Sequence, residues 1–487
     1  MTTYEPIIGL EIHAELMTNS KMFCGCKVVD SVEAEPNTAV CPVCLGMPGM
    51  LPVINKKAVE FAMRVALALN CDIQHHNIFA RKNYFYPDLP KAYQISQYEL
   101  PIGTQGWVDI QLESGEHKRI GIRRVHMEED TGKLTHLEGN GSTNGYSLVD
   151  YNRSGVPLLE IVSEPDIHSG EEARAYGLKI RQILRYLGVN SGDMEKGVLR
   201  VEPNISLRPL GTIAFGKRTE LKNLNSFKAL ADGSAYEIAR QAEILDAGGE
   251  VIQETRGWHD AKRITFSQRS KEEAEDYRYF PEPDLPPLQI SDEWIVAVGA
   301  ALPELPDAKI ARYQTDYGLS EYDARVLAEE KEVAAWFEEV VAHFSDAKVV
   351  ANWILNNLFQ LMNEHKQAIG EIRVTASGLA ELLQLVAANT INNNTAKEVL
   401  AEMFVSGESA EAIVAAKGLA QISDETAVSA MITTILDQHS DQVAAYINGK
   451  EQLRGWFVGQ VMRLSKGKAN PALVNKILTE QIEQRRS

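Results

Sequence analysis

The sequence has no long hydrophobic stretch and no targeting segment. None of its apolar runs approaches the roughly 20 residues that a membrane-spanning helix requires. Residues 1–8 lack the basic segment and apolar core of a secretory signal, and they are not the Arg- and Ser-rich opening of an organellar transit peptide. We therefore expect a cytoplasmic protein with no membrane partner.

Basic residues are also scarce relative to acidic ones. The chain has 49 Lys and Arg against 67 Asp and Glu, a net charge of −18. Proteins that coat nucleic acids in general carry a basic footprint, so this balance argues against that class. It leaves room for a local basic patch on an acidic body.

The length and patterning predict an α+β fold with three domains. At roughly 150 residues per domain, 487 residues suggest about three. Up to about Pro287 the chain shows short strands, expected at 7–16, 121–127, 158–162 and 200–207. One helix there begins at Ser169, which with Glu172 forms a capping box, and Gly188 ends it.

Beyond the proline-dense segment 280–288 the pattern is helical to the end, with a break near 404–409. We predict a mixed region over 1–292 and helical domains over 293–405 and 406–487. The segment 139–145 is expected to be a hairpin loop.

The first predicted strand carries polar residues on one face. Alternation puts Glu11, His13 and Glu15 on the side opposite the apolar residues. Glu11 and His13 would lie roughly 7 Å apart, which allows one divalent cation between them. An ordinary half-exposed strand would look the same.

Two further segments present oxygen ligands. Strict alternation places Glu128 with His126, and Glu129 with the apolar Val125, although a bulge would change this. The sequence alone leaves open which glutamate points into the site. In 201–207, Glu202 and Asn204 share a side. Three such strands favour a magnesium–nucleotide site, because magnesium prefers oxygen ligands and keeps positions open for phosphates.

The cysteines give a sharper local pattern. Two pairs, Cys24 with Cys26 and Cys41 with Cys44, are separated by a short loop, and this spacing is typical of a structural zinc site. The alternative is four free buried cysteines. The fifth, Cys71, lies in an apolar stretch and is expected in the core.

Other segments suggest contacts with a nucleotide or with RNA. Residues 81–91 combine cations with aromatics, a mixture that can stack a base and contact phosphates, although a strand with core aromatics fits equally well. We assign Lys82 and Tyr84, with Glu202 and Asn204, to nucleotide binding. Near the C-terminus, Arg463, Lys466 and Lys468 form a local basic excess that suits RNA backbone contact, as would a solvated helix end.

The segment 211–217 nearly matches a P-loop. Arg218 stands where the magnesium-binding Ser or Thr belongs, and a strand follows where a helix is required. We expect a hairpin turn there instead.

Taken together, these segments resemble the GatB family of tRNA-dependent amidotransferase subunits along essentially the whole chain. The resemblance rests on Ile8-Gly-Leu-Glu-Ile-His13, on Arg81-Lys-Asn-Tyr-Phe-Tyr-Pro-Asp88, on Lys91–Gln97, on His126-Met-Glu-Glu-Asp-Thr-Gly-Lys133, on 150–153, 160–166, 220–226 and 276–284, and on the tail 459–471.

The resemblance implies a catalytic cradle related to glutamine synthetase and guanidino kinases, a helical domain, and a YqeY-like tail that binds tRNA. It implies ATP-dependent amidation of misacylated Glu-tRNA(Gln) or Asp-tRNA(Asn), in a heterotrimer with an amidase, the A subunit, plus a small C subunit. By the family pattern Glu11, His13 and Glu129 match magnesium-site positions, with Glu128 close by. The cysteine pairs match a zinc knuckle that only some members have.

Two other functions stay open at this point. If the chain were a non-catalytic tRNA scaffold, the acid-lined strands would be surface with no catalytic role. A stand-alone ligase that amidates a free small acid would not need the basic tail or the two helical domains.

Overall fold

The structure is a computed structural model that describes residues 4–30, 32–137, 145–270, 277–421, 424–465 and 468–486. The chain divides into two compact units, residues 1–306 and 307–487. The predicted hairpin loop at 139–145 lies, except for Gly145, outside the described residues. No described helix combines the length and apolarity needed to cross a membrane.

The first unit contains strands and four helices within the described residues. In chain order they are β1 (Tyr4–Glu15), α1 (Lys56–Ala68), β2 (Asp72–Ile73), β3 (His76–Asn77), β4 (Phe79–Asn83), β5 (Tyr93–Gln97), β6 (Gly103–Gln111), β7 (His117–Glu129), β8 (Lys133–Leu137), β9 (Tyr146–Asp150), β10 (Pro157–Ser163), α2 (Gly170–Tyr186), β11 (Leu199–Pro209), β12 (Thr219–Lys222), α3 (Phe227–Asp246), β13 (Glu254–His259), β14 (Ile264–Ser270), β15 (Phe280–Pro281), β16 (Leu288–Gln289) and α4 (Asp292–Ala300).

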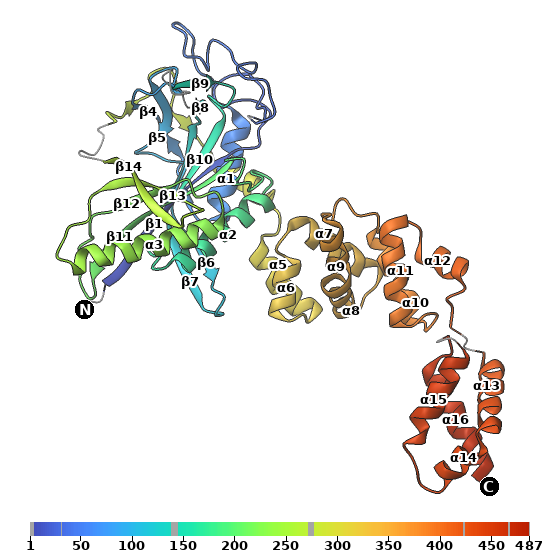
Figure 1. The fold of residues 1–487 in the computed structure, drawn as a ribbon. Coiled ribbons are helices and arrows are strands. Elements are labelled where there is room, and N and C mark those ends of the chain that lie inside the picture. Colours follow the sequence, from blue (N-terminus) through green and yellow to red (C-terminus); the bar gives the residue numbers. More distant parts are fainter. Residues whose placement is uncertain are drawn as a thin grey trace. The chain divides into compact units, whose positions relative to one another are not determined.

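A nine-stranded sheet forms the centre of this unit, in the order β14-β13-β12-β11-β1-β10-β7-β6-β2. Neighbouring strands are antiparallel except β12 and β13, which are parallel and are joined through α3 (Figure 1). The strands predicted at 7–16, 121–127, 158–162 and 200–207 correspond to β1, β7, β10 and β11. Those four strands are consecutive neighbours in the sheet, which brings their polar faces together.

Helices α1, α2 and α3 cover one face of the sheet and share its hydrophobic core (Figure 1). The core-facing residues of β1 are Leu10, Ile12 and Ala14, all fully buried. The predicted capping of α2 is confirmed, since the Glu172 N–H donates to the Ser169 hydroxyl over 3.1 Å. Gly188 follows the helix with φ +66°, a conformation that suits glycine.

Smaller sheets lie beyond the main one. Their strand orders are β15-β4-β5, β16-β3 and β8-β9. The segment 211–217 connects the antiparallel strands β11 and β12, so the expectation of a hairpin turn rather than a P-loop is confirmed.

The second unit is helical throughout its described residues. Its elements, starting from the helix that spans the division, are α5 (Pro306–Tyr317), α6 (Glu321–Leu327), α7 (Lys331–His343), α8 (Ala347–Trp353), the π-helical turn η1 (Ile354–Leu358), α9 (Phe359–His365), α10 (Ala376–Ala387), α11 (Asn393–Ser406), α12 (Ala410–Lys417), α13 (Glu425–Gln438), α14 (Ser440–Ile447), α15 (Leu453–Leu464) and α16 (Pro471–Arg486).

Two separate cores support these helices. One includes buried residues from Tyr313 to Val414, and the other includes residues from Val428 to Ile482. A helix does end within the predicted break, where Gly407 follows α11 with φ +78°, but the first core continues past it to Val414. The α+β region followed by helices is confirmed. The boundaries 1–292, 293–405 and 406–487 and the relation to glutamine synthetase stay predictions.

Candidate active site and cysteine cluster

The face of the main sheet opposite α1–α3 carries charged side chains in regular rows. The antiparallel register sets Glu11 opposite Glu202 on β11 and opposite Val162 on β10. One step along, His13 lies opposite Glu160, and Glu160 lies opposite His126 on β7. Because residues opposite each other on neighbouring strands are roughly 5 Å apart, these rows bring together groups that are distant in the sequence.

Glu160 is the centre of the first group. Its Oε2 lies 3.5 Å from His13 Nε2 and 3.0 Å from His126 Nε2. Glu128 is close by, with Oε1 3.9 Å from His13 Nε2, and it accepts a hydrogen bond from the Ser96 hydroxyl. Ligand atoms of His13, Glu128 and Glu160 all lie within 4.8 Å of one another, as a metal site requires.

Three carboxylates form the second group. Glu11, Glu202 and Glu220 have ligand atoms within 4.8 Å of one another. Lys222 lies 2.9 Å from Glu202 and 3.2 Å from Glu220, so it balances part of their charge. Asn204 donates a hydrogen bond to Glu11 over 3.1 Å. Of the predicted nucleotide-binding residues, Glu202 and Asn204 therefore do lie beside Glu11.

The electrostatics of the two groups differ. Burial lowers the pKa of His13, but its hydrogen bond to Glu160 and the nearby carboxylates outweigh burial and raise it to about 9. Burial raises the pKa of Glu160, yet the charge of His126 and the histidine hydrogen bonds bring it well below the ordinary value. In contrast, burial and the charge of Glu160 raise the pKa of Glu11. This acid-rich site favours the binding of positive charge.

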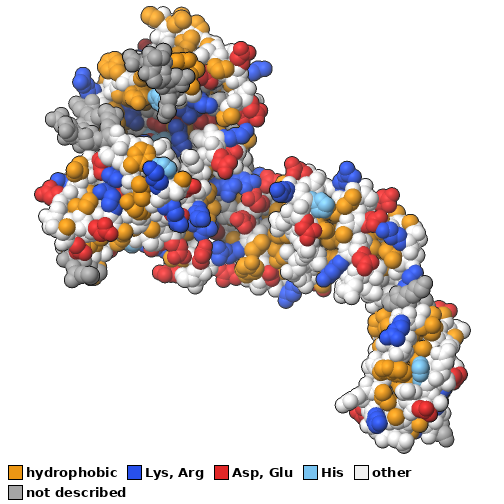
Figure 2. Space-filling model, viewed as in Figure 1, with side chains coloured by type: hydrophobic (Ala, Val, Ile, Leu, Met, Phe, Trp, Pro, Cys, Tyr) orange, Lys and Arg blue, Asp and Glu red, His pale blue; other side chains and the backbone are white. Residues whose placement is uncertain are grey.

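The small sheet of β4, β5 and β15 supplies the cation and aromatics predicted from residues 81–91. Lys82 faces the first group: burial lowers its pKa, but the charges of Glu128, Tyr279 and Glu160 outweigh burial and raise it. Tyr84 follows β4, and its hydroxyl donates to Gln94 over 3.3 Å. Figure 2 shows lysine and arginine side chains inside a hollow between the part of the surface with β4 and β5 and the part with β11 and β12.

Glu129 lies elsewhere. Its Oε1 is 2.6 Å from Lys91 Nζ and accepts the Ile95 N–H over 3.0 Å. The alternation of β7 holds to the end of the strand, so Glu128 rather than Glu129 joins His13. The structure also separates Glu11 from His13 into different groups, whereas the sequence suggested that one cation lies between them.

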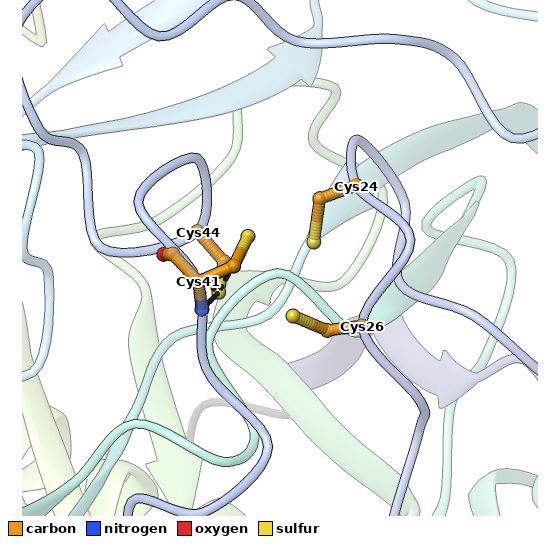
Figure 3. Close-up of side chains that lie close together, drawn as sticks. All are labelled: Cys24, Cys26, Cys41 and Cys44. Atoms are coloured by element: carbon orange, nitrogen blue, oxygen red, sulfur yellow. Dashed lines mark hydrogen bonds between the residues drawn. The ribbon is translucent and has the colours of Figure 1, made fainter.

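The four cysteines converge in space. Figure 3 shows Cys24 and Cys26 on one loop facing Cys41 and Cys44 on another. Their sulfurs lie within 4.8 Å of one another. A hydrogen bond from Cys24, against the effect of burial, lowers the pKa of Cys44 to about 4, and the Cys41 N–H also donates to that sulfur. Cys71 is buried in the core, as expected.

The predicted tRNA-binding residues lie in or beside the last helical group, which consists of α13 to α16. Arg463 is exposed in the final turn of α15, and Lys468 is half-buried. Lys466 lies outside the described residues.

Sequence reasoning missed Glu160 and Glu220 as members of the site. Glu160 interrupts the apolar run of β10, where only 7% of it is exposed. A single acid inside a buried strand is a signal that could have identified it, because such a charge needs partners. Glu220 carries no such signal, since its partners follow only from the β11–β12 register.

Comparison with known proteins identifies the family. Residues 6–296 match the family described as the GatB/GatE catalytic domain, and residues 335–482 match the family described as the GatB domain. These matches define a catalytic region on the sheet-containing unit and a family-specific helical region after it.

Full-length relatives define the family further. The B subunit of the aspartyl/glutamyl-tRNA(Asn/Gln) amidotransferase of Thermodesulfovibrio yellowstonii is 52% identical, with 99% of this chain and 100% of the relative covered. The protein of the same name from Geobacter sp. is 53% identical over 99% of both chains. The chain belongs to the GatB family of amidotransferase B subunits.

Proposed function

We propose that this chain is the part of a tRNA-dependent amidotransferase that activates the side-chain carboxylate of glutamate or aspartate attached to tRNA, using ATP. The observation that carries the proposal is the pair of ligand groups on the polar face of the sheet, within the region that matches the GatB/GatE catalytic domain. The amidotransferase named in the relatives makes an amide from a carboxylate, and a carboxylate must be activated before ammonia can replace its oxygen.

The ligand groups fit divalent cations. The group of Glu11, Glu202 and Glu220 is all carboxylate, which is what magnesium prefers, and the group of His13, Glu128 and Glu160 offers two carboxylates and an imidazole. When bound, magnesium neutralises phosphate charge and leaves positions open for phosphate oxygens. The acidic residues would hold the cation, and Glu128 takes the place that the family resemblance suggested for Glu129.

The chain's own residues would orient the reactants. Lys82 faces the first group with no hydrogen bond to another described residue, so its ammonium is available for a phosphate. A carboxylate oxygen of the substrate attacks the γ-phosphorus of ATP and ADP leaves, which forms an acyl phosphate. Ammonia then attacks the acyl carbon, the phosphate leaves with the bond electrons, and the nitrogen loses a proton. This scheme needs no covalent protein nucleophile.

The cysteine cluster is proposed as a structural zinc site. Four sulfurs bound to one zinc at about 2.3 Å stand about 3.8 Å apart, close to the arrangement present. The tail is proposed to contact the tRNA backbone through Arg463, Lys466 and Lys468. The relatives are named as B subunits, which implies an enzyme of several subunits. From the family resemblance we propose a heterotrimer with an amidase, the A subunit, which supplies ammonia, plus a small C subunit.

The decisive experiment measures ADP release by the chain assembled with the amidase and the small third protein. We expect ADP to form only when misacylated Glu-tRNA(Gln) or Asp-tRNA(Asn) is present, and in step with amide formation. ADP release with free glutamate would favour a stand-alone ligase. Amide formation that consumes no ATP would contradict the proposal, and tRNA binding without any turnover would favour a scaffold.

A further inference from the structure

One arginine on the polar face has no partner in the part of the chain that the structure describes. Arg124 lies on β7 two residues before His126 and therefore on the same face. Its Nε–H is buried and makes no hydrogen bond, and its guanidinium forms no ion pair with a described carboxylate. Arg124 is half-buried, and a buried donor that lacks a partner is costly, so an anion bound from outside the protein would satisfy it.

The neighbouring cations contrast with Arg124. Arg200 donates to Asp130 over 2.8 Å, and Lys91 lies 2.6 Å from Glu129. Lys222 is held between Glu202 and Glu220. These three are compensated by carboxylates, whereas Arg124 pairs with none among the described residues.

An aromatic ring lies beside Arg124. Its Cζ lies 6.0 Å from the ring centroid of Tyr98, which stacks on Tyr279 with centroids 4.3 Å apart and planes 11° apart. Tyr98 follows β5 and Tyr279 precedes β15, so both rings come from the small sheet over the site. Burial raises the pKa of the Tyr279 hydroxyl to about 12 against the effect of Lys82. Tyr98 thus contacts the guanidinium over its ring face without carrying a charge that would pair with it.

The register places Arg124 across from the carboxylate group. One row of the polar face contains Glu202, Glu11, Val162 and Arg124 on four successive strands. The backbones of Glu11 and Arg124 are therefore two strand spacings apart, roughly 9–10 Å. The residue between them, Val162, is short and uncharged. An anion over Val162 would lie between the carboxylate-bound cation and the guanidinium.

We propose that Arg124, which lies beside Tyr98, is a phosphate-binding residue for the nucleotide. The planar guanidinium donates two parallel hydrogen bonds to a phosphate, which suits it to the phosphoryl group in transfer. This inference rests on the proposed function. It adds a second cation, unpaired within the described part of the chain, to the site beside Lys82.

Arg123 provides a matched control. It precedes Arg124 at an irregularity in the β7–β10 pairing, is exposed, and pairs with Glu164 over 2.7 Å. Arg124→Gln and Arg123→Gln should be compared in the complete complex for ADP release, ATP affinity and ADP affinity. Thermal unfolding would show whether both variants fold. Arg124→Lys keeps the positive charge but cannot donate two parallel hydrogen bonds. It serves as a second variant if Arg124→Gln does not fold.

We expect Arg124→Gln to reduce kcat/KM for ATP on the order of 10²–10³-fold. The kcat/KM of Arg123→Gln should stay close to that of the unmodified chain, and the kcat/KM of Arg124→Lys should lie between the two. A loss of affinity for ATP but not ADP assigns Arg124 to the transferred phosphoryl group, and a loss for both assigns it to the phosphates that ADP retains.

The inference is overturned if Arg124→Gln matches Arg123→Gln, or if only the KM for aminoacyl-tRNA rises, since the anion would then be the substrate carboxylate. Absence of ATP-dependent turnover in the unmodified complex would instead contradict the proposed function itself.

Discussion

His13 and Glu160 stand directly opposite each other on β1 and β10, and their side chains approach to 3.5 Å. Almost 150 residues separate them in the chain, and only the register of the central sheet joins them. Glu160 also lies close to His126, which comes from β7 on the other side of β10. The carboxylate therefore connects three strands of the site.

Replacing this carboxylate should stop the chemistry without preventing assembly. We expect Glu160→Gln to lower the rate of ATP-dependent amide formation at least ~100-fold, because a ligand for the cation and the partner of His13 are both lost. ADP release in the assembled complex measures this, and glutamine hydrolysis by the amidase should persist. Glu164→Gln, four residues on, is the control, because Glu164 is half-buried, pairs with Arg123 and belongs to neither ligand group. Equal rates in the two variants would remove Glu160 from the site.

Replacing Glu128 and replacing Glu129 should have different effects, one on catalysis and the other on stability. Glu128→Gln should abolish ADP release, because Glu128 lies with His13 and Glu160. Glu129→Gln should instead lower the free energy of unfolding by about 3–5 kcal/mol, because Lys91 is left buried without its partner. Denaturant unfolding and ADP release on both variants decide between them. The assignment is reversed if Glu129→Gln stays fully stable but cannot form ADP.

The cysteine cluster should contain one zinc per chain. Cys41→Ser should remove the metal and lower the temperature of unfolding, since a structural zinc contributes directly to folding. Cys71→Ala is the control, because Cys71 lies in the core and should leave the metal content unchanged. Elemental analysis of the purified chains measures both. A metal-free chain with unchanged stability would contradict the zinc assignment.

In the helical unit, Glu338 should make stability depend on acid pH. Its Oε1 lies 2.6 Å from Lys309 and 2.8 Å from the Tyr313 hydroxyl. Burial raises its pKa, but these hydrogen bonds outweigh burial and hold it below the ordinary value of 4.5. A lowered carboxyl pKa stabilises the fold above the unfolded pKa, and this contribution is lost as pH falls through the folded value.

We therefore expect Glu338→Gln to lower the free energy of unfolding by about 2 kcal/mol at pH 7. The difference from the unmodified chain should shrink as the pH falls below about 4.5. Thermal unfolding at several pH values measures it. A difference that stays constant down to pH 3 would show that charge is not the cause.

The last helical group should bind tRNA rather than take part in the chemistry. Its core, from Val428 to Ile482, is separate from the preceding one, so a chain ending at residue 421 should keep its other cores. We expect this truncation to raise the KM for misacylated tRNA. The slope of the logarithm of the binding constant against the logarithm of the salt concentration should become less steep by roughly 0.7–0.9 for each phosphate contact that is lost. At saturating tRNA, kcat should fall much less. A collapse of kcat at unchanged KM would mean that the tail positions the substrate.

Local patterns predicted local features well. Alternation along β1 correctly put Glu11 and His13 on the polar face, and the box of Ser169 with Glu172 correctly marked the start of α2. The paired cysteines converge as their spacing indicated.

The partners of these residues could not be predicted in the same way. Glu11 and His13 belong to different ligand groups because their neighbours, Glu202 and Glu160, come from strands on opposite sides of β1. Strand order and register arise from the packing of the whole sheet, and one strand's pattern does not contain them.

On the ribosome, β1 is made early but its partners are made late. Both of its neighbours in the sheet follow much later, since β10 begins at Pro157 and β11 at Leu199. At translation rates of roughly 5–20 residues per second, β1 waits on the order of ten seconds for its first partner. During that time a strand with a wholly apolar side and free edges is open to wrong pairing. The order of synthesis therefore leaves β1 without either neighbour of the central sheet until β10 has been made.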